Sequence, residues 1–344
     1  MLLLPAQHIV RKLPENYQAG ELDFCKPEFA YDTNAVHQHL YTHVYINAKG
    51  HLYRSNYKII EEALINPVDF KKPGFIKFLK KVVFKKKRAL PANEQYLFCF
   101  DEWTNNHYHW ICDFLPRLAV LKNEIRKYTL LLPDTIYLRT VGVTLLSTFN
   151  LLPKRIEWVL QNELVSIPSL QLITHPLLSG RVHDSLIQKV RSGLELDSTQ
   201  AIVPGRRVYI SRAKADHRKV INEDEVIAVL KGFNFEILNF EDLNIEQQME
   251  LSGQTTILVS IHGAGLTNAM FMQPNTAVLE FRRDGIYHNQ CFWHLSSALG
   301  LKYYYLFGQP DEDKVIEGPH GCNLTISIGE LRKVVERMIA DNNG

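Results

Sequence analysis

The chain has 344 residues, of which 46% are hydrophobic and 22% are charged. This composition is that of a globular protein and excludes a disordered or fibrous chain, and the length favours two domains over one. The formal net charge of +2 gives no general electrostatic case for binding nucleic acid. Five scattered cysteines without a CxxC pair argue against a disulfide framework and fit a reducing compartment.

The N-terminal region combines short predicted strands with one strongly basic segment. Residues 1–60 are expected to form short strands, with a hairpin over 42–53. Residues 71–88 hold nine Lys or Arg and no acid, and their pattern predicts a basic amphipathic helix. Such a helix either lies on an anionic membrane surface or packs on its own domain, and periodicity does not separate the two. No apolar run reaches the ~18 residues of a membrane span, so we expect a cytoplasmic location, with the inner face of the membrane as the surface contacted.

From residue 95 onward, strand and helix patterns alternate, which predicts an α/β fold with doubly wound parallel sheets. We expect a kinked helix over 106–127 and a capping box at Asn222 and Glu225. Further strands are expected at 96–100, 135–138, 156–159, 170–173, 207–211, 235–238, 257–261, 277–281 and 303–306, and further helices at 181–197, 245–252, 288–299 and 328–340. The expected parts are an N-terminal domain (1–180), a linker helix and loop (181–204), a C-terminal domain (205–327) and a final helix (328–344) that packs back on the N-terminal domain.

The predicted strand 257–261 runs directly into the sequence HGAGLTN at residues 262–268. Gly263 and Gly265 permit a tight strand-to-helix turn and the close approach of a phosphate to free backbone N–H groups. His262, Thr267 and Asn268 add polar groups, so the turn predicts a phosphate site. An ordinary packing turn is the competing interpretation, because the sequence is neither GxGxxG nor GxxxxGK[ST].

Other charged residues follow strands of the same predicted sheet. Ser211 and Arg212 end one strand, and a guanidinium suits a bidentate grip on pyrophosphate. Taken alone, Arg212 reads better as a surface residue of a basic loop. Glu280 lies in an apolar strand, where it either accepts hydrogen bonds from ribose hydroxyls or pairs with Arg282 or Arg283.

A third group of polar residues lies on the helix predicted after residue 105. Asn105, His109, Asp113 and Arg117 are spaced by four and share one helical stripe. His109 and Asp113 are within contact distance, and a His–carboxylate pair is a candidate for proton transfer. A solvated i,i+4 pair is the alternative, but the large aromatic side chains beside the stripe favour the wall of a cleft.

Two possible metal signals are discounted. Residues 311–313 match a DxD pattern in a loop among other charges, and of His37, His39 and His43 only the first two share a face of a strand. The sequence also lacks a GxSxG elbow and a Cys–His nucleophile context. It therefore predicts neither a metal site nor a covalent nucleophile.

Two ordered groups of motifs cover roughly residues 95–310. The first is N-x-x-x-H-W-x-x-D-x-L-P-R-L at 105–118, and the second is Y-I-S-R followed by H-G-A-G-L-T-N-x-x-F and L-E-F within 209–281. In this combination the chain resembles glycosyltransferase family 61, which includes bacterial capsule and lipopolysaccharide transferases, plant xylan-decorating enzymes and animal protein O-linked N-acetylglucosamine transferases. Residues 1–94 carry no motif of that family.

The resemblance implies a GT-B architecture of two Rossmann-like domains that face a central cleft. It implies inverting transfer from a nucleoside-diphosphate sugar, UDP-linked by expectation, to a glycan hydroxyl without an essential metal or other cofactor. The acceptor would be a capsule, lipopolysaccharide or other surface polysaccharide, lipid-linked in one version. Asp113 would be the catalytic base with His109 beside it, and Asn105 and Arg117 would lie on the acceptor side. The donor site would comprise Ser211, Arg212, His262, Gly263, Ala264, Gly265, Leu266, Thr267, Asn268 and Glu280.

Two other functions remain open at this point. A sugar-nucleotide epimerase would use the same nucleotide site but need no acceptor. A non-catalytic scaffold of a polysaccharide assembly complex would bind nucleotide poorly or not at all.

Overall fold

The structure, a computed structural model, describes residues 1–67, 86–194, 205–283, 289–317 and 321–343. The chain folds into two compact α/β units, each built on a sheet that contains parallel strands. Unit 1 comprises Met1–His8 and Asp32–Leu196, and unit 2 comprises Ile9–Tyr31 and Asp197–Gly344. Within the described ranges, no helix combines the length and the apolar character that crossing a membrane requires.

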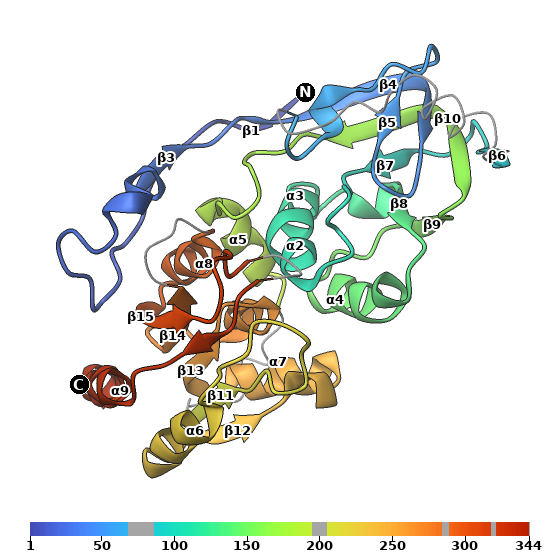
Figure 1. Cartoon of the computed structure of the whole chain (residues 1–344). Coiled ribbons are helices and arrows are strands. Elements are labelled where there is room, and N and C mark those ends of the chain that lie inside the picture. Colours follow the sequence, from blue (N-terminus) through green and yellow to red (C-terminus); the bar gives the residue numbers. More distant parts are fainter. Residues whose placement is uncertain (68–85, 195–204, 284–288, 318–320, 344) are drawn as a thin grey trace. The chain divides into compact units, whose positions relative to one another are not determined.

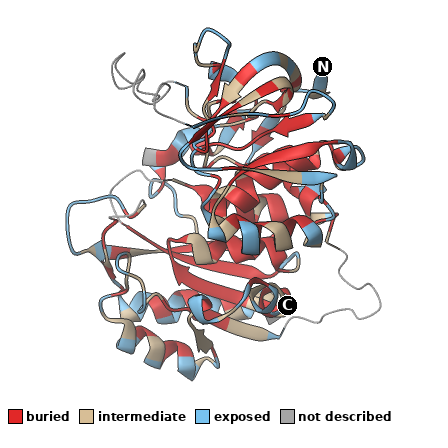
Figure 2. Cartoon of the chain, turned by 90° about the vertical axis from the view of Figure 1, so that its right-hand side faces the viewer, coloured by how far each residue is buried: buried red, intermediate tan, exposed pale blue. Residues whose placement is uncertain are grey.

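The sheet of unit 1 is mixed. Strands β7, β8 and β9 run parallel to one another and β7 runs parallel to β10, whereas β4 is antiparallel to β10. Every residue of β7 and β8 is buried, as expected for parallel strands covered on both faces (Figure 2). The order of the described strands is β1 (Leu2–Leu4), β4 (Val36–Ile46), β10 (Glu163–Ile173), β7 (Tyr96–Phe98), β8 (Thr129–Pro133) and β9 (Arg155–Val159), with β5 (Leu52–Tyr53) on β4 and β6 (Lys86–Ala89) on β10.

Helical segments connect these strands, and one of them differs from the sequence-based prediction. The segment 135–138, predicted as a strand, belongs to a helix, because the Thr135 hydroxyl accepts the N–H of Leu138 at 3.2 Å and so caps the turn. The described helical segments of unit 1 are η2 (Glu61–Ala63), α2 (His107–His109), η3 (Trp110–Phe114), α3 (Leu115–Ala119), η4 (Ile125–Lys127), η5 (Leu138–Gly142), α4 (Val143–Thr148) and α5 (Asp184–Arg191).

Unit 2 carries a sheet with the strand order β12–β11–β13–β14–β15–β16, in which the first five strands are parallel (Figure 1). In chain order this is the doubly wound pattern 2-1-3-4-5, followed by an antiparallel edge strand. The strands are β11 (Arg206–Ile210), β12 (Glu236–Leu238), β13 (Thr255–Ile261), β14 (Ala277–Arg283), β15 (Lys302–Pro310) and β16 (Leu324–Thr325). The helices are α6 (Glu223–Gly232), η6 (Phe240–Asp242), α7 (Ile245–Gly253), η7 (Ala264–Phe271), α8 (Cys291–Leu299) and α9 (Ile328–Asn343).

Residues 9–31, expected in the N-terminal domain, belong to unit 2. The Trp293 indole donates to the Lys12 carbonyl at 2.7 Å, and the Glu15 N–H donates to the Tyr303 carbonyl at 2.8 Å. This segment contains η1 (Asp23–Glu28), and β2 (His8–Val10) pairs with β3 (Ala30–Asp32) at its ends. Such contacts join residues almost 300 positions apart, so local sequence patterns do not reveal them.

Helix α9 contributes to the core of unit 2. Its buried residues Leu331, Val335 and Met338 join that hydrophobic core, where α9 packs against α6 and β15. The apolar stripe of this helix is therefore covered within unit 2.

Two further local predictions are corrected. Asn222 does not form the predicted capping box with Glu225, because its side chain exchanges two 2.9 Å hydrogen bonds with the backbone of Ile326. Residues 71–85 of the predicted basic helix lie outside the described residues, as does the linker loop 195–204. Residues 86–88 form strand β6 rather than the end of a helix, and Arg88 pairs with Glu157 and Glu163.

Candidate active site

The segment that carries His109 and Asp113 is helical, as predicted, but it contains a π-turn. The Asn106 side chain caps its start, and η3 is the π-turn, with a bond from the Leu115 N–H to the Trp110 carbonyl. The wider turn lies immediately before Pro116, which has no N–H to donate to the preceding turn. Single π-turns within helices occur frequently at functional sites.

Asp113 sits at the centre of a small hydrogen-bond cluster. Its Oδ2 lies 2.7 Å from Nδ1 of His109 and accepts the Ser179 hydroxyl at 2.6 Å. The Ser179 oxygen is also 3.0 Å from the same His109 nitrogen. Within the described part of the chain, Oδ1 of Asp113 has no hydrogen-bond partner, so one carboxylate oxygen is held and the other is available. Sequence patterns do not reveal Ser179, because it lies in a loop 66 residues away without a motif of its own.

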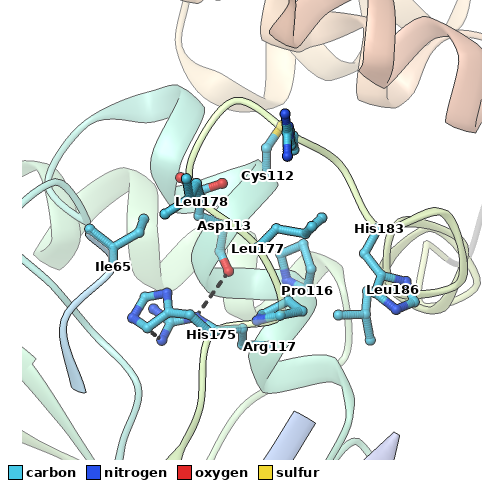
Figure 3. Close-up of a pocket in the computed structure, with 12 residues that line it drawn as sticks. Ile65, Cys112, Asp113, Pro116, Arg117, His175, Leu177, Leu178, His183 and Leu186 are labelled. Atoms are coloured by element: carbon cyan, nitrogen blue, oxygen red, sulfur yellow. Dashed lines mark hydrogen bonds between the residues drawn. The ribbon is translucent and has the colours of Figure 1, made fainter. Parts of the chain in front are cut away.

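Arg117, predicted on the acceptor side, is buried and donates hydrogen bonds to groups around the Asp113 cluster. The side chain is 1% exposed and donates to Asp101 at 3.1 Å, to the Cys99 carbonyl and to the Asp113 carbonyl at 3.3 Å. It also donates to Nε2 of His175 at 2.8 Å (Figure 3). The guanidinium thus links the helix, the end of β7 and the loop after β10.

The surroundings of Arg117 shift the pKa values of two of its partners. Burial, reinforced by the positive charge of Arg117, holds the pKa of His175 well below its ordinary value, so the imidazole is neutral and accepts at Nε2. Burial raises the pKa of Asp101, and Arg117 opposes that shift. The close ion pair keeps one buried positive charge next to one buried acid.

Asn105 does not share the helical stripe with His109 and Asp113. The helix begins after Asn106, and the exposed Asn105 side chain accepts the Thr135 hydroxyl at 2.5 Å. Its predicted place on the acceptor side therefore has no support from a contact with the cluster.

In unit 2, the predicted phosphate turn lies at a topological switch point. The strand order reverses between β11 and β13, and ligands of doubly wound sheets bind at the carboxyl edge of such a point. Arg212 follows β11 and Gly263 follows β13. A Cβ atom on Gly263 would lie 3.0 Å from Nη1 of Arg212, so the guanidinium rests directly on the glycine. The structure thus brings these two predicted residues together.

A second arginine, Arg218, lies beside Arg212 in the loop after β11. Arg212 donates to the carbonyls of Arg218 and His217 at 3.1 and 3.3 Å. Burial lowers the pKa of Arg212, and burial together with the charge of Arg212 lowers the pKa of Arg218 to about 10. The Arg218 Nε is buried without a hydrogen-bond partner in the described part of the chain. Two partly desolvated cations that repel each other create a local positive potential that favours binding of an anion.

Glu280, predicted to contact the ribose, contacts His262 and Tyr303 in this structure. Glu280 is 1% exposed, lies 2.5 Å from Nδ1 of His262 through Oε1, and accepts the Tyr303 hydroxyl at 2.5 Å through Oε2. Arg282 donates to the Tyr303 oxygen at 3.2 Å. Burial opposes ionisation, yet the pKa of Glu280 is lowered because His262 and these neighbours stabilise the carboxylate. Glu280 therefore orients His262.

The remaining predicted donor-site residues divide into backbone and packing roles. Segment η7 is a 3₁₀ helix, so the N–H groups of Ala264 and Gly265 at its start have no acceptor one turn back. Thr267 and Asn268, expected to face the ligand, are buried in its second turn. Asn268 donates to the Gly265 carbonyl at 3.1 Å and so stabilises the turn. Leu266 is fully buried, and the buried Ser211 hydroxyl accepts the Ala213 N–H at 3.1 Å.

The acids at 311–313 each have a protein partner. Asp311 accepts from Asn323, Glu312 pairs with Lys314 and Asp313 pairs with Arg283. Within the described ranges, no group of three or more His, Cys, Asp or Glu side chains has a metal-binding arrangement.

Comparison with known families gives the site its context. The model of the family described as Glycosyltransferase 61 matches residues 107–279, which is half of the chain. The chain belongs to glycosyltransferase family 61. The matched range of this family 61 chain begins at the helix of His109 and Asp113 and extends past the glycine turn in unit 2.

Curated animal relatives match shorter stretches. An "EGF domain-specific O-linked N-acetylglucosamine transferase" from Drosophila melanogaster is 33% identical over 101 residues, which are 28% of this chain and 19% of that protein. The protein of the same name from Bos taurus is 28% identical over 137 residues, covering 37% of this chain and 26% of the relative. The matched part of the family 61 chain thus spans about a quarter or less of the length of these relatives.

Proposed function

We propose that the chain is an inverting, metal-independent glycosyltransferase. It would move a sugar from a nucleoside-diphosphate sugar, UDP-linked, to the hydroxyl of a glycan acceptor such as a surface polysaccharide. The observation that carries this proposal is the partly buried Arg212 against Gly263 at the switch point of unit 2, with the partly buried Arg218 beside Arg212. Membership of glycosyltransferase family 61 supports it, as does the Asp113 carboxylate with one available oxygen.

The proposed reaction is a single displacement at the anomeric carbon. Asp113 would accept the proton of the acceptor hydroxyl at Oδ1, while the acceptor oxygen forms a bond to the anomeric carbon. At the same time the bond from that carbon to the diphosphate oxygen breaks, and the nucleoside diphosphate leaves with an added negative charge. Arg212, Arg218 and the first N–H groups of η7 would stabilise this charge. His262 would lie beside the diphosphate, oriented by Glu280.

The GT-B arrangement is part of the proposal. The 2-1-3-4-5 sheet of unit 2 supports a Rossmann-like donor half, and the parallel strands of unit 1 support a second α/β half. The proposal also keeps a cytoplasmic location and contact of the segment 71–88 with an anionic membrane, both of which rest on sequence alone. Vesicle flotation tests that contact, because equal recovery with neutral and anionic lipid would contradict it.

The names of the curated relatives favour a second candidate acceptor and a donor sugar. Proteins named as EGF domain-specific transferases of N-acetylglucosamine suggest transfer of that sugar to a hydroxyl of a protein. In this version the donor chemistry of unit 2 is unchanged, and only the acceptor differs.

A turnover screen of the full chain separates these functions. The screen combines UDP-glucose, UDP-galactose, UDP-xylose and UDP-N-acetylglucosamine with polysaccharide fragments or an EGF domain, and mass spectrometry detects the product. Transfer to an acceptor with EDTA present supports the proposal. Conversion of a nucleotide sugar without acceptor would identify an epimerase, and the absence of UDP binding by calorimetry would indicate a scaffold.

A further inference from the structure

Trp103 is an exposed aromatic side chain beside the Asp113 cluster. It is 39% exposed, which is more than any other Trp, Tyr or Phe whose side chain the structure describes. Its ring centroid lies 5.2 Å from that of His109, with 39° between the ring planes. Trp103 lies before the family match, which begins at residue 107, so the match assigns no role to it.

The position of Trp103 is fixed by the network beneath it. The backbone N–H of Trp103 donates to Oδ1 of Asp101 at 2.9 Å, and its backbone carbonyl accepts the N–H of Asn106 at 2.9 Å. The other carboxylate oxygen of Asp101 is held by the buried Arg117. The anchored turn therefore presents the apolar face of the indole to solvent at a defined position beside His109.

We propose that Trp103 is a stacking platform for a pyranose ring of the acceptor. This inference rests on the proposed glycosyl transfer and names the acceptor as a sugar. A pyranose has an apolar face of C–H groups with slight positive charge, which complements the negative face of the indole. Its hydroxyls project from the rim of the ring.

The neighbouring groups suit the rim of such a ring. The His109 side chain is 22% exposed, and its Nε2 has no hydrogen-bond partner within the described ranges, so it can bind a sugar hydroxyl. Oδ1 of Asp113 can accept the proton of another hydroxyl. A serine or threonine acceptor carries its hydroxyl one bond from the Cβ and lacks an apolar plate, so it would leave the indole face uncovered.

The test measures acceptor binding apart from turnover. Saturation-transfer NMR on the full chain uses methyl glucopyranoside, galactopyranoside, mannopyranoside and xylopyranoside, with a threonine-containing peptide as a separate probe. In the wild type we expect saturation to pass to the C–H groups on one face of at least one pyranoside. This signal should be lost in Trp103→Ala. Trp103→Phe keeps an aromatic face and should retain part of the signal. Leu152→Ala is the matched control, because Leu152 is also 39% exposed in unit 1, and it should behave like wild type.

Kinetics and donor binding complete the test. With a glycan acceptor, Trp103→Ala should raise acceptor KM about tenfold and leave UDP binding unchanged. Wild-type signal in Trp103→Ala, no pyranoside signal in wild type, or peptide binding alone would overturn the inference. If the wild-type chain did not bind UDP, the proposed transferase function would be refuted, regardless of the pyranoside signals.

Discussion

Gly263 lies against the Arg212 guanidinium, so that a Cβ atom at position 263 would stand 3.0 Å from Nη1 of that arginine. The two residues are 51 positions apart and meet because β11 and β13 are neighbours in a parallel sheet. The backbone at Gly263 is extended, so the glycine is needed for this close approach and not for an unusual conformation. The guanidinium also donates to the carbonyls of Arg218 and His217.

Gly263→Ala should weaken UDP binding. The added methyl group pushes Arg212 away from the turn, and that arginine is already fixed by two carbonyls. We expect a loss of affinity on the order of tenfold, which is ~1.4 kcal/mol, measured by calorimetry. Gly329→Ala is the control, because a Cβ there meets no atom within 4 Å. Equal affinities for Gly263→Ala and wild type would remove this contact from the donor site.

Asp113→Asn should abolish transfer and spare donor binding. An amide cannot accept the acceptor proton, so we expect kcat to fall by roughly 10²–10⁴, with UDP affinity within twofold of wild type. Asp134→Asn is the matched control, since Asp134 is an acid of unit 1 paired with Arg139 away from the cluster. If Asp113→Asn turned over at the wild-type rate, another group would have to be the base.

The stability of unit 2 should depend on Glu280 in a pH-dependent way. The pKa of Glu280 is lowered from its ordinary 4.5: burial acts against that shift, and His262 and its other partners outweigh burial. The unfolded chain therefore binds this proton more readily, and the stabilisation is complete above the ordinary pKa and lost as pH falls through the folded one. Glu280→Gln should cost about 3 kcal/mol at pH 7, and denaturant titrations should show the gap to wild type closing toward pH 3.

A matched control separates this effect from general acid denaturation. Glu312→Gln removes an acid of unit 2 from an exposed pair with Lys314, and it should change stability little at either pH. If the gap in unfolding free energy between wild type and Glu280→Gln widened on acidification, the folded-state pKa of Glu280 would have to be raised rather than lowered.

Sequence patterns predicted the contacts whose signal is local. The i,i+4 spacing of His109 and Asp113 predicted their contact, and the apolar runs before Arg212 and Gly263 predicted β11 and β13. The helix that starts near Thr135 was missed because its apolar residues resemble a strand, while the side chain that caps it carries the deciding information.

The part of the site that the sequence did not predict depends on the fold. The strand order brings Ser179 to Asp113 and Tyr303 to Glu280, whereas Arg218 lies in the loop after β11 and contacts Arg212 through its carbonyl. A serine in a loop, an arginine in a basic stretch and a tyrosine in a strand have no sequence pattern that marks them. Their burial and partners distinguish them, and both are properties of the fold.

We expect Arg218 to lower the stability of unit 2 while contributing to UDP binding. Its guanidinium is desolvated and repelled by Arg212, which together lower its pKa to about 10. Its φ is +59°, a conformation that asparagine tolerates better than most residues. Arg218→Asn should therefore leave the thermal midpoint unchanged or raise it, because a poorly solvated charge is removed. The same change should weaken UDP binding at least tenfold, as one of two cations facing the diphosphate is lost.

Salt dependence gives this prediction a second readout. If two cations hold the diphosphate, UDP affinity should fall with ionic strength, and the slope should be shallower in Arg218→Asn than in wild type. Lys231→Gln removes one positive charge from the exposed face of α6 and should match wild type in both affinity and slope. If Arg218→Asn lowered the thermal midpoint and bound UDP like wild type, Arg218 would be a structural residue and the anion would be held by Arg212 and the η7 backbone alone.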